Sequence, residues 1–286
     1  MEPAYVIVAS EADPVAARVV ARWGVPPATG DLVDGVPIRR LSEHALLLRR
    51  PGIHIHDERL DRRLPGALRE RGVTLVFPSI HRSERNVRCL TVHPLGNPGP
   101  TAEVGGRPRT LDPTDPLRMT ALLRALAERA APIGLSATFE ATHHGPEVEL
   151  PAFFAEIGYG EDDGPSDAAV RVLADEIPRI EVDLRDRAAL GIGGGHYAPH
   201  FTDLALRRSW AFGHLLSRHA LGQLDTTLAR SAWERTPGAV GILCARAEDA
   251  QTPALAGLGP RLREGAAPRR GTVDGTTPAS RPASGT

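Results

Sequence analysis

Lysine is absent from the chain, and cysteine nearly so. All 34 basic residues among the 286 are arginines, a replacement that a GC-rich genome explains better than a function does. The two cysteines, Cys89 and Cys244, exclude a disulfide framework and leave no Cys-x-x-Cys metal spacing. A metal site would therefore use histidine and carboxylate ligands, and the chain contains 11 histidines.

Long apolar runs and a strong net charge are missing as well. No stretch reaches the roughly 18 apolar residues of a membrane span, and the first residues lack the pattern of a signal peptide. The formal net charge is -1 and 41% of the residues are hydrophobic, which excludes a disordered chain and a strongly basic nucleic-acid coat protein. We expect a cytoplasmic monomer with no membrane partner.

Strand-like and helix-like segments alternate along the chain, which predicts an α/β fold with a mixed, mainly parallel sheet flanked by helices. The strands are expected at Tyr5–Ser10, Ala45–Leu48, Ile53–Ile55, Val73–Phe77, Cys89–His93, Leu135–Thr142, Ala152–Gly158, Arg187–Ile192 and Val240–Cys244. The helices are expected at Pro14–Trp23, Asp57–Arg71, Pro116–Ala131, Asp167–Ile177, Thr202–Leu206 and Leu215–Leu221. Between them, Asn97–Asp115 is rich in Gly, Pro and Thr and is expected to form a loop.

The composition changes near residue 264. Residues 1–263 are expected to form one compact α/β unit, and any division into two lobes is expected near residues 100–132. Residues 264–286 contain Gly, Pro, Ser and Thr but few large apolar side chains, so we predict a disordered tail.

The stretch Phe139–Gly158 carries the densest group of chemically active side chains. His143 and His144 are neighbours, with Glu140 before them and Glu156 after them. Adjacent side chains on a strand point to opposite faces, so both histidines reach one ligand only if the backbone turns there. The alternative is a purely structural role, in which one histidine is solvated and the other hydrogen-bonds the turn. The sequence supports this alternative about as well as it supports a binding or catalytic site.

A second stretch, Ala189–Pro199, runs from an apolar strand into Gly193, Gly194 and Gly195 and then His196. Consecutive glycines let a backbone approach a ligand closely and present N–H groups to an oxyanion. The spacing matches neither a dinucleotide fingerprint nor a P-loop. A flexible turn is the alternative, and the histidine directly after the glycines favours a site.

Other histidines are weaker candidates. His81 and His93 follow or end predicted strands, and His214 follows a glycine. His219 is expected on a helix surface, and His44, His54 and His56 are expected to be structural. The arginines between Arg49 and Arg71 are dense enough to form a weak basic patch.

The segments EATHHGPEVELPAFFAEIG and ALGIGGGHYAPHFTDLALRRSWAFGHLL, with LTVHPLGN at Leu90–Asn97, resemble the archaeal and plant type of D-aminoacyl-tRNA deacylase. The likeness covers nearly all of the chain except the tail. It implies a fold similar to those of phosphorylases and peptidyl-tRNA hydrolases, a D-aminoacyl-tRNA substrate whose ester is hydrolysed, and zinc, with two ions in each subunit. The matching positions are Glu140, His143, His144, Glu156, His196, His214, His81 and His93.

Ester hydrolysis needs a positioned water, a base and an oxyanion stabiliser, and zinc held by His and carboxylate ligands suits that chemistry. On the basis of the resemblance we expect metal ligands at His143, His144, Glu156 and His196. Glu140 would orient a ligand or act as a base, His214 would move a proton, and His81 and His93 complete the catalytic candidates. The amides of Gly193, Gly194 and Gly195 would stabilise the oxyanion.

Two other functions remain open from the residues. One is a metal-independent enzyme similar to peptidyl-tRNA hydrolases or nucleoside phosphorylases, which fold-level similarity does not separate from a deacylase. The other is a non-catalytic module that binds tRNA or nucleotides. Phosphate binding uses arginine and backbone amides, so the several candidate histidines argue against it.

Overall fold

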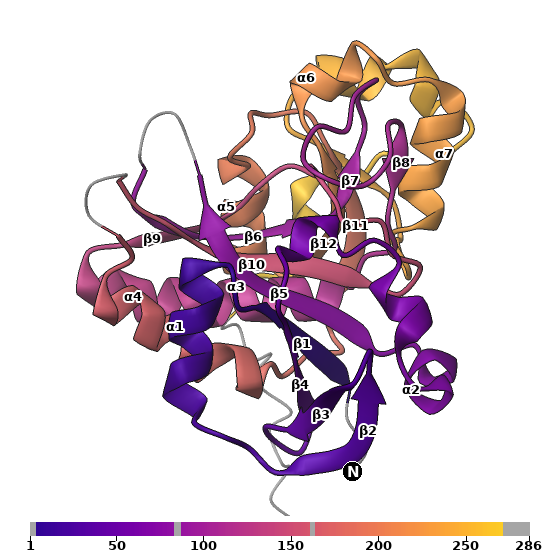
Figure 1. The fold of residues 1–286 in the computed structure, drawn as a ribbon. Helices are drawn as coiled ribbons and strands as arrows, with labels where there is room; N and C mark the ends of the chain where they lie inside the picture. Colours follow the sequence, from indigo (N-terminus) through magenta and orange to yellow (C-terminus); the bar gives the residue numbers. More distant parts are fainter. Residues whose placement is uncertain (1–3, 83–86, 161–163, 271–286) are drawn as a thin grey trace, which may run out of the picture.

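The computed structural model describes residues 4–82, 87–160 and 164–270. It contains an eight-stranded sheet with the order β2-β3-β4-β1-β5-β10-β6-β9, a three-stranded sheet β12-β11-β13 and a small hairpin β7-β8 (Figure 1). The large sheet consists of β1 (Tyr5–Ser10), β2 (Ala28–Val33), β3 (Val36–Arg40), β4 (Ala45–Arg50), β5 (Thr74–His81), β6 (Cys89–Pro94), β9 (Ser136–Phe139) and β10 (Ala152–Gly158). The other strands are β7 (Gly96–Asn97), β8 (Thr110–Leu111), β11 (Arg187–Ile192), β12 (Trp210–Leu216) and β13 (Ile242–Cys244).

The sheets are mixed and mainly parallel, as predicted. Strands β4, β1, β5 and β10 run parallel to one another, β6 pairs antiparallel with β10, and both pairings in the three-stranded sheet are parallel. Buried parallel strands expose neither face to water, and β1 fits this rule, since all six of its residues are buried. The change from one sheet to the other falls between β10 and β11, after the range 100–132 in which a lobe boundary is predicted.

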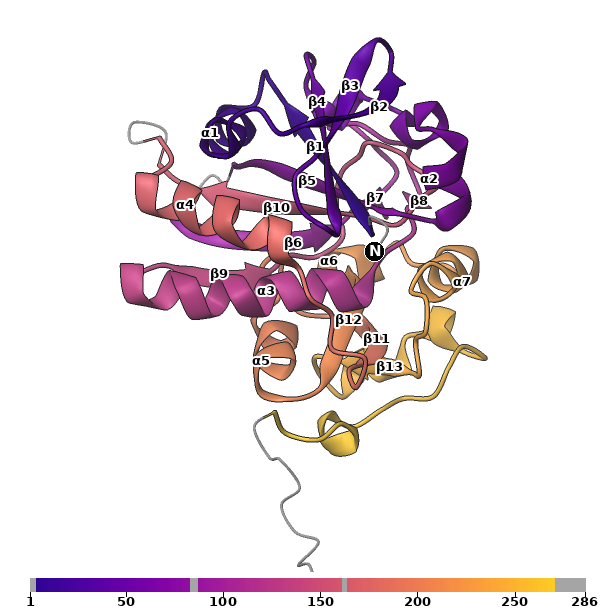
Figure 2. The ribbon, with the colours of Figure 1, turned by 90° about the horizontal axis from the view of Figure 1, so that it is seen from below.

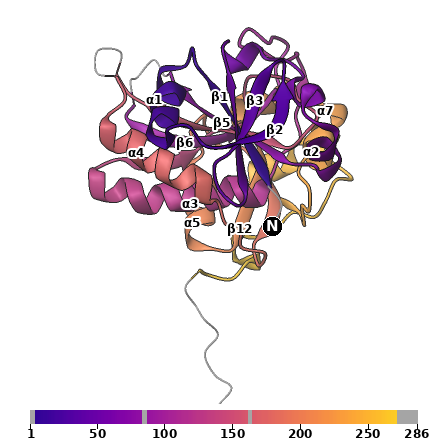
Figure 3. The same cartoon turned by 60° about the horizontal axis from the view of Figure 1, so that its bottom comes forward.

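Helices cover both faces of the large sheet. The helices are α1 (Pro14–Trp23), α2 (Gly66–Arg71), α3 (Pro116–Ala130), α4 (Asp167–Glu176), α5 (Pro199–Arg207), α6 (Arg218–Leu221) and α7 (Thr226–Glu234). Figures 2 and 3 show α1, α3 and α4 on one side of the sheet and α2 on the other. Because side chains alternate along β1, Ile7 packs in the core with α1, α3 and α4, whereas Val6 and Val8 pack in the core with Leu68 of α2.

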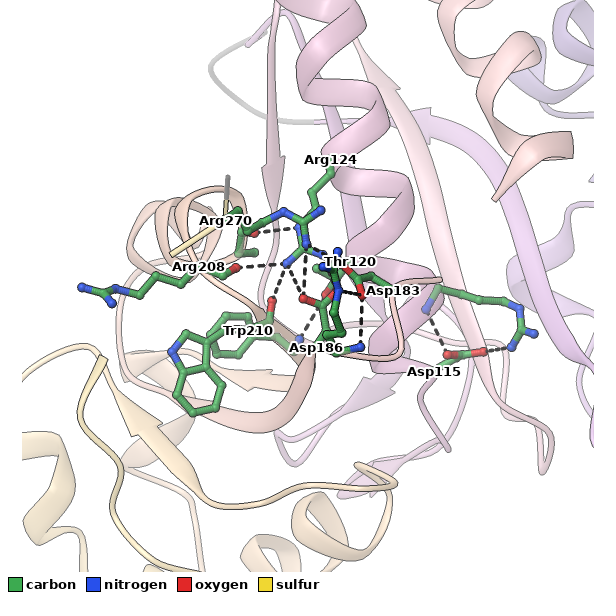
Figure 4. A network of polar contacts seen from close by, with 12 residues as sticks. Asp115, Thr120, Arg124, Asp183, Asp186, Arg208, Trp210 and Arg270 are labelled. Carbon is green, nitrogen blue, oxygen red and sulfur yellow. Dashed lines mark hydrogen bonds and ion pairs between the residues drawn. The ribbon is translucent and has the colours of Figure 1, made fainter. Parts of the chain in front are cut away.

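Arg124 of α3 joins the two sheets (Figure 4). Its guanidinium donates hydrogen bonds to the backbone carbonyls of Ala205, Arg208 and Trp210, where α5 leads into β12, and forms an ion pair with Asp186. The side chain of Asp186 is almost fully buried. One buried charge pair therefore connects the central helix to the start of the smaller sheet.

The sequence pattern located several elements to the residue. Tyr5–Ser10, Ala152–Gly158 and Arg187–Ile192 are strands, and Pro14–Trp23 is a helix, with the predicted bounds. The hairpin β2-β3 and the helix α7 are absent from the prediction. Residues 264–270 were assigned to the tail but pack on the body, since Pro268 accepts a hydrogen bond from Ser209 and Ala267 is fully buried. Residues 271–286 of that predicted tail lie outside the described residues.

Three predicted elements are wrong. The strand expected at Ile53–Ile55 is a 3-10 turn at His54–His56. The helix expected at Asp57–Arg71 is split into a 3-10 turn and α2 because Pro65 disfavours helical backbone at the residue before it. The helix expected at Leu215–Leu221 is the end of β12 followed by the single turn of α6.

Strand β5 continues through Pro78, although Val73–Phe77 is the predicted strand. The amide of Leu75 points toward β10, so that of residue 78, an odd number of positions away, would point toward β1. Pairing with β1 ends at Val76, and a proline at position 78 therefore costs no ladder hydrogen bond. This extension carries His81 to the end of the strand.

Candidate active site

Seven of the eight predicted functional side chains meet where the strands of the large sheet approach the turn after β11. They form three overlapping groups in which the possible ligand atoms lie within 4.8 Å of one another. The groups are His93, His143 and His144; Glu140, His143 and His196; and His81, Glu140 and Glu156. We call this set the His/Glu cluster.

The buried end of the cluster is built on paired strands. Glu156 on β10 lies opposite Ser79 of β5 and Thr91 of β6, so its neighbours His81 and His93 come from the strands on either side. His81 Nδ1 lies 3.1 Å from Glu140 Oε1 and 3.4 Å from Glu156 Oε2. The side chains of the two histidines and the two glutamates are at most 3% exposed, so water does not screen their charges.

The open end of the cluster faces a pocket of about 540 Å³. His143, His144 and His196 line it together with Gly194 and Gly195. His196 is about half exposed, and its Nε2 lies 3.5 Å from the fully buried Oε1 of Glu140. The pocket therefore gives a ligand access to a cluster whose deeper carboxylates are closed to solvent.

A turn at His144 places two neighbouring histidines in one cluster. His144 has a φ of 38°, a left-handed conformation that non-glycine residues rarely adopt. The ring centroids of His143 and His144 lie 4.5 Å apart, and those of His93 and His143 lie 4.0 Å apart. The backbone turn that the sequence argument requires is thus made at His144 itself.

Backbone carbonyls orient the same two rings. His143 Nδ1 lies 2.8 Å from the carbonyl oxygen of Ala141, and His144 Nδ1 lies 2.7 Å from that of Gly145. A carbonyl oxygen only accepts, so each Nδ1 carries the proton and each Nε2 keeps its lone pair. Neutral imidazoles with a fixed tautomer are the form in which histidine binds metals.

The electrostatics shift the pKa values of the cluster histidines in opposite directions. Burial and the neighbouring His93 lower the pKa of His144 to about 4, and burial with three surrounding histidines lowers the pKa of His143 well below its usual value. Burial would also lower the pKa of His81, but the carboxylates of Glu156 and Glu140 outweigh it and raise that pKa. Burial would raise the pKa of Glu156, yet the imidazoles of His81 and His93, whose nitrogens lie 3.4 and 3.7 Å from its oxygens, keep that pKa far below its usual range.

The donor set of the cluster fits a metal ion. Among the residues that the structure describes, neither carboxylate oxygen of Glu140 accepts a hydrogen bond and Nε2 of His93 has no hydrogen-bond partner, although both side chains are fully buried. Buried polar atoms without partners are costly, and a cation among them would remove that cost. Imidazole nitrogens with carboxylate oxygens are ligands that suit Zn²⁺.

The structure does not bring His214 into the cluster. The ring is fully buried, its Nε2 donates to the backbone carbonyl of Asp112 at 2.9 Å, and its Nδ1 lies 3.0 Å from Thr142 Oγ1. Burial lowers its pKa to about 3. A neutral ring with both nitrogens engaged joins β12 to the segment after β9, so the predicted proton transfer by His214 has no geometric basis.

The three glycines divide between two roles. The amide of Gly193 donates to the carbonyl of Leu216, so the prediction that it stabilises an oxyanion is wrong. Gly193 has a φ of 95°, and a Cβ there would lie 2.1 Å from Asp249 Oδ2, so this position requires glycine. Gly194 and Gly195 line the pocket, and their amides make no hydrogen bond within the described residues.

Tyr197 belongs to the site, although the sequence argument gives it no role. Its hydroxyl lies 2.8 Å from His81 Nε2, on the side of the ring opposite the carboxylates. Its position directly after His196 is the signal in the sequence that points to it. His219, expected on a helix surface, lines the pocket from α6 without joining the cluster.

The basic patch expected between Arg49 and Arg71 is largely neutralised. Arg49 pairs with Glu11, Arg62 with Glu149, and Arg63 with Asp34 and Asp57. Exposed arginines that already pair with carboxylates offer little net charge to a polyanion. These paired arginines therefore contribute little to a basic patch.

Comparison with known proteins decides the family. Residues 69–254, which include the whole cluster, match the family model described as D-aminoacyl-tRNA deacylase. The chain belongs to the D-aminoacyl-tRNA deacylase family. The match covers well over half of the chain, as the motifs around His143 and His196 predict.

Archaeal relatives carry the same description. The chain is 38% identical over 173 residues to the D-aminoacyl-tRNA deacylase of Thermoplasma acidophilum, covering 60% of this chain and 67% of the relative. It is 32% identical over 248 residues to that of Methanococcoides burtonii, covering 84% of this chain and 51% of the relative. For Methanoregula boonei the identity is 44% over 163 residues, which cover 55% of this chain and 36% of the relative. The chain thus spans about two thirds or less of the length of these three relatives.

A solved structure shares the fold. The crystal structure of a conserved protein of unknown function superimposes with a TM-score of 0.76 at 24% identity, covering 88% of this chain and 91% of that protein.

None of the described helices combines the length and the apolar surface that crossing a bilayer requires.

Proposed function

We propose that this chain hydrolyses the ester that joins a D-amino acid to tRNA, releasing the free amino acid and the tRNA. The observation that carries the proposal is the His/Glu cluster at the floor of a pocket, within the residues that match the deacylase family model. A charged tRNA as substrate agrees with the expected cytoplasmic location.

We propose further that the cluster holds zinc. His93, His143 and His144 would hold one ion, His81, Glu140 and Glu156 a second, and His196 would complete the set between them. Bound zinc would supply Lewis acidity, which polarises a carbonyl and lowers the pKa of water.

The side chains around the cluster have separate tasks in this proposal. His143 and His144 present Nε2 lone pairs because their Nδ1 protons are bound to carbonyls. Glu140 Oε1 lies 3.5 Å from His196 Nε2 at the pocket and 3.1 Å from His81 Nδ1 in the interior, so it would orient both imidazoles. The amides of Gly194 and Gly195 would donate to the oxygen on which negative charge develops.

The experiment that tests the function compares D-tyrosyl-tRNA and L-tyrosyl-tRNA as substrates of the purified chain. We expect release of tyrosine from the D-ester at a rate well above that from the L-ester. Tight binding of tRNA without ester cleavage would instead identify a binding module, and cleavage of both esters at the same rate would contradict a D-specific deacylase.

Two substitutions test whether the His/Glu cluster carries out the hydrolysis. His143→Ala and His196→Ala are expected to lower kcat/KM about a hundredfold or more, since a Lewis acid contributes several kcal/mol to catalysis. His44→Ala, at a partly exposed histidine outside the cluster, is the matched control and should leave the rate unchanged. Unchanged turnover in both cluster variants would remove the basis of the assignment.

A further inference from the structure

A second hollow, of about 410 Å³, lies between α7 and the strand β8. We call it the α7 pocket, and nothing in the proposed hydrolysis uses it. Its polar lining consists of three arginines, three hydroxyl side chains and one carboxylate: Arg107, Arg109, Arg235, Thr110, Thr227, Ser231 and Asp225. Three positive charges therefore face one negative charge.

The lining contains one arginine that forms no direct ion pair among the described residues. Arg109 forms an ion pair with Asp225, and Arg107 pairs with Glu147 outside the pocket. The guanidinium of Arg235 makes no hydrogen bond or ion pair within the described part of the chain. It is partly buried, so it loses some hydration, and its charge acts on the carboxylates of Asp112 and Glu149 without a direct contact.

Hydroxyl groups near this guanidinium add hydrogen-bond capacity. The side chains of Thr227 and Ser231 form no hydrogen bond among the residues that the structure describes, and both belong to α7, one turn apart on the face that leads to Arg235. A planar guanidinium with adjacent hydroxyl donors matches the oxygens of a phosphodiester, which is how proteins position nucleic-acid backbones. The chemistry of the hollow therefore suits a phosphate.

The α7 pocket adjoins the active-site pocket. Gln223 lines the active-site pocket, and its backbone carbonyl accepts a hydrogen bond from Arg109 at 3.1 Å. Asn97, also in the active-site lining, pairs with Thr110, which lines the α7 pocket. Figure 1 shows β7 and β8 together beside α6 and α7. The two pockets are therefore adjacent. The β7-β8 hairpin borders both of them, and one residue separates Gln223 of the active-site pocket from Asp225 of the α7 pocket.

We propose that the α7 pocket binds a backbone phosphate of the single-stranded 3′ end of tRNA while the terminal ester lies at the His/Glu cluster. This inference rests on the proposed function, because it gives that function a second contact with its substrate. It also accounts for tRNA binding by a chain with a formal net charge of -1, since only a local contact is needed.

The first test measures binding of uncharged tRNA to the wild-type chain, Arg235→Gln and Arg230→Gln. Arg230 is exposed on the same helix and does not line the pocket, so it is the matched control. Loss of one phosphate contact should lower the slope of log affinity against log salt by about 0.7 to 0.9. Between about 50 and 200 mM salt, the affinity difference between the wild type and Arg235→Gln should then shrink about threefold. Equal slopes in all three proteins, or equal losses in both variants, would overturn the proposal.

The second test compares D-tyrosyl-tRNA with the D-tyrosyl ester of adenosine, which carries no phosphate. The ratio of kcat/KM for the two esters should fall in Arg235→Gln and keep its wild-type value in Arg230→Gln. Saturation of the pocket by inorganic phosphate with no effect of Arg235→Gln on tRNA binding would indicate a site for the free ion and overturn the proposal. If the wild type cleaves neither ester, the proposed function fails, whereas the binding measurement still tests the pocket.

Discussion

The backbone at His144 determines whether two histidines that are adjacent in the sequence can serve one site. A residue with a φ of 38° is strained, and such strain persists where the surrounding structure holds it. Gly145 follows directly, and its Cα faces the backbone of Gly106 so closely that a Cβ at position 145 would lie 2.2 Å from the Gly106 amide nitrogen. The neighbouring glycine-rich loop therefore packs against the residue that follows this turn.

Tyr197 is expected to position His81. Tyr197→Phe removes the hydroxyl that lies 2.8 Å from His81 Nε2, and the loss of an outer hydrogen bond to a metal-binding imidazole typically weakens metal affinity about tenfold or more. The measurement is a competition titration of zinc against a chromophoric chelator. Tyr159→Phe, at a partly buried tyrosine outside the cluster, is the control. An affinity of Tyr197→Phe equal to that of the wild type would show that His81 needs no support from Tyr197.

The cluster was predictable from residue type and position, but the division of roles was not. Glu140, His143, Glu156 and His196 stand near the ends of predicted strands, and strand ends are where such folds place their sites. His214 was singled out because it follows a glycine, but its role differs, because burial and two hydrogen bonds that no sequence pattern encodes determine what it does.

At the scale of elements, α3 depends on the contacts of Arg124. Arg124→Met would leave the buried Asp186 with Arg270 as its remaining ion-pair partner, and three backbone carbonyls would lose their donor. Breaking a buried ion pair costs about 3–5 kcal/mol of unfolding free energy. Urea denaturation measures this difference.

Arg129 on the same helix offers the matched comparison. It is about half exposed and pairs with Asp175 and Glu176 at 3.6 and 3.5 Å, so Arg129→Met should cost about 1 kcal/mol or less. Equal losses in the two variants would mean that Arg124 does not connect the two sheets in the way proposed.

Element prediction succeeded where local pattern and tertiary environment agree. Ala152–Gly158 is apolar except for Glu156 and is buried on both faces, so its strand is well defined by the sequence. Leu215 and Leu216 were assigned to a helix because a short apolar run does not distinguish helix from strand, and pairing with β11 decides for the strand. The hairpin β2-β3 was not predicted because most of β2 is exposed and its sequence lacks the alternation of apolar and polar residues that indicates a strand.

At the scale of the whole molecule, Asp112 connects three distant segments. Its amide donates to Leu95, its carboxylate accepts from the amide of Val148, and its carbonyl accepts from His214 of β12. Burial raises the pKa of this carboxyl to about 7, while Arg235 opposes the shift. The protonated form is therefore the one that the folded state favours.

This raised pKa predicts how stability depends on pH. The folded state keeps the proton of Asp112 between its usual pKa of 3.8 and about 7, so stability is lost as the pH rises through that range, by at most about 1.4 kcal/mol for each pH unit. Asp112→Asn cannot titrate and keeps an oxygen for the Val148 amide. Urea denaturation at several pH values between 4 and 8 should show that the variant gains stability relative to the wild type as the pH rises. If the unfolding free energies of the variant and the wild type changed equally with pH, the raised pKa of Asp112 would be contradicted.

The central claim is that one His/Glu cluster performs a metal-dependent hydrolysis of D-aminoacyl-tRNA. The measurement that tests it most directly is the rate of D-tyrosyl-tRNA cleavage by one preparation before chelation, after chelation and after zinc is returned. We expect the activity to be lost with the chelator and restored by about two equivalents of zinc per chain, the number that the overlapping ligand groups can hold. Full D-selective activity in metal-free protein would contradict the account.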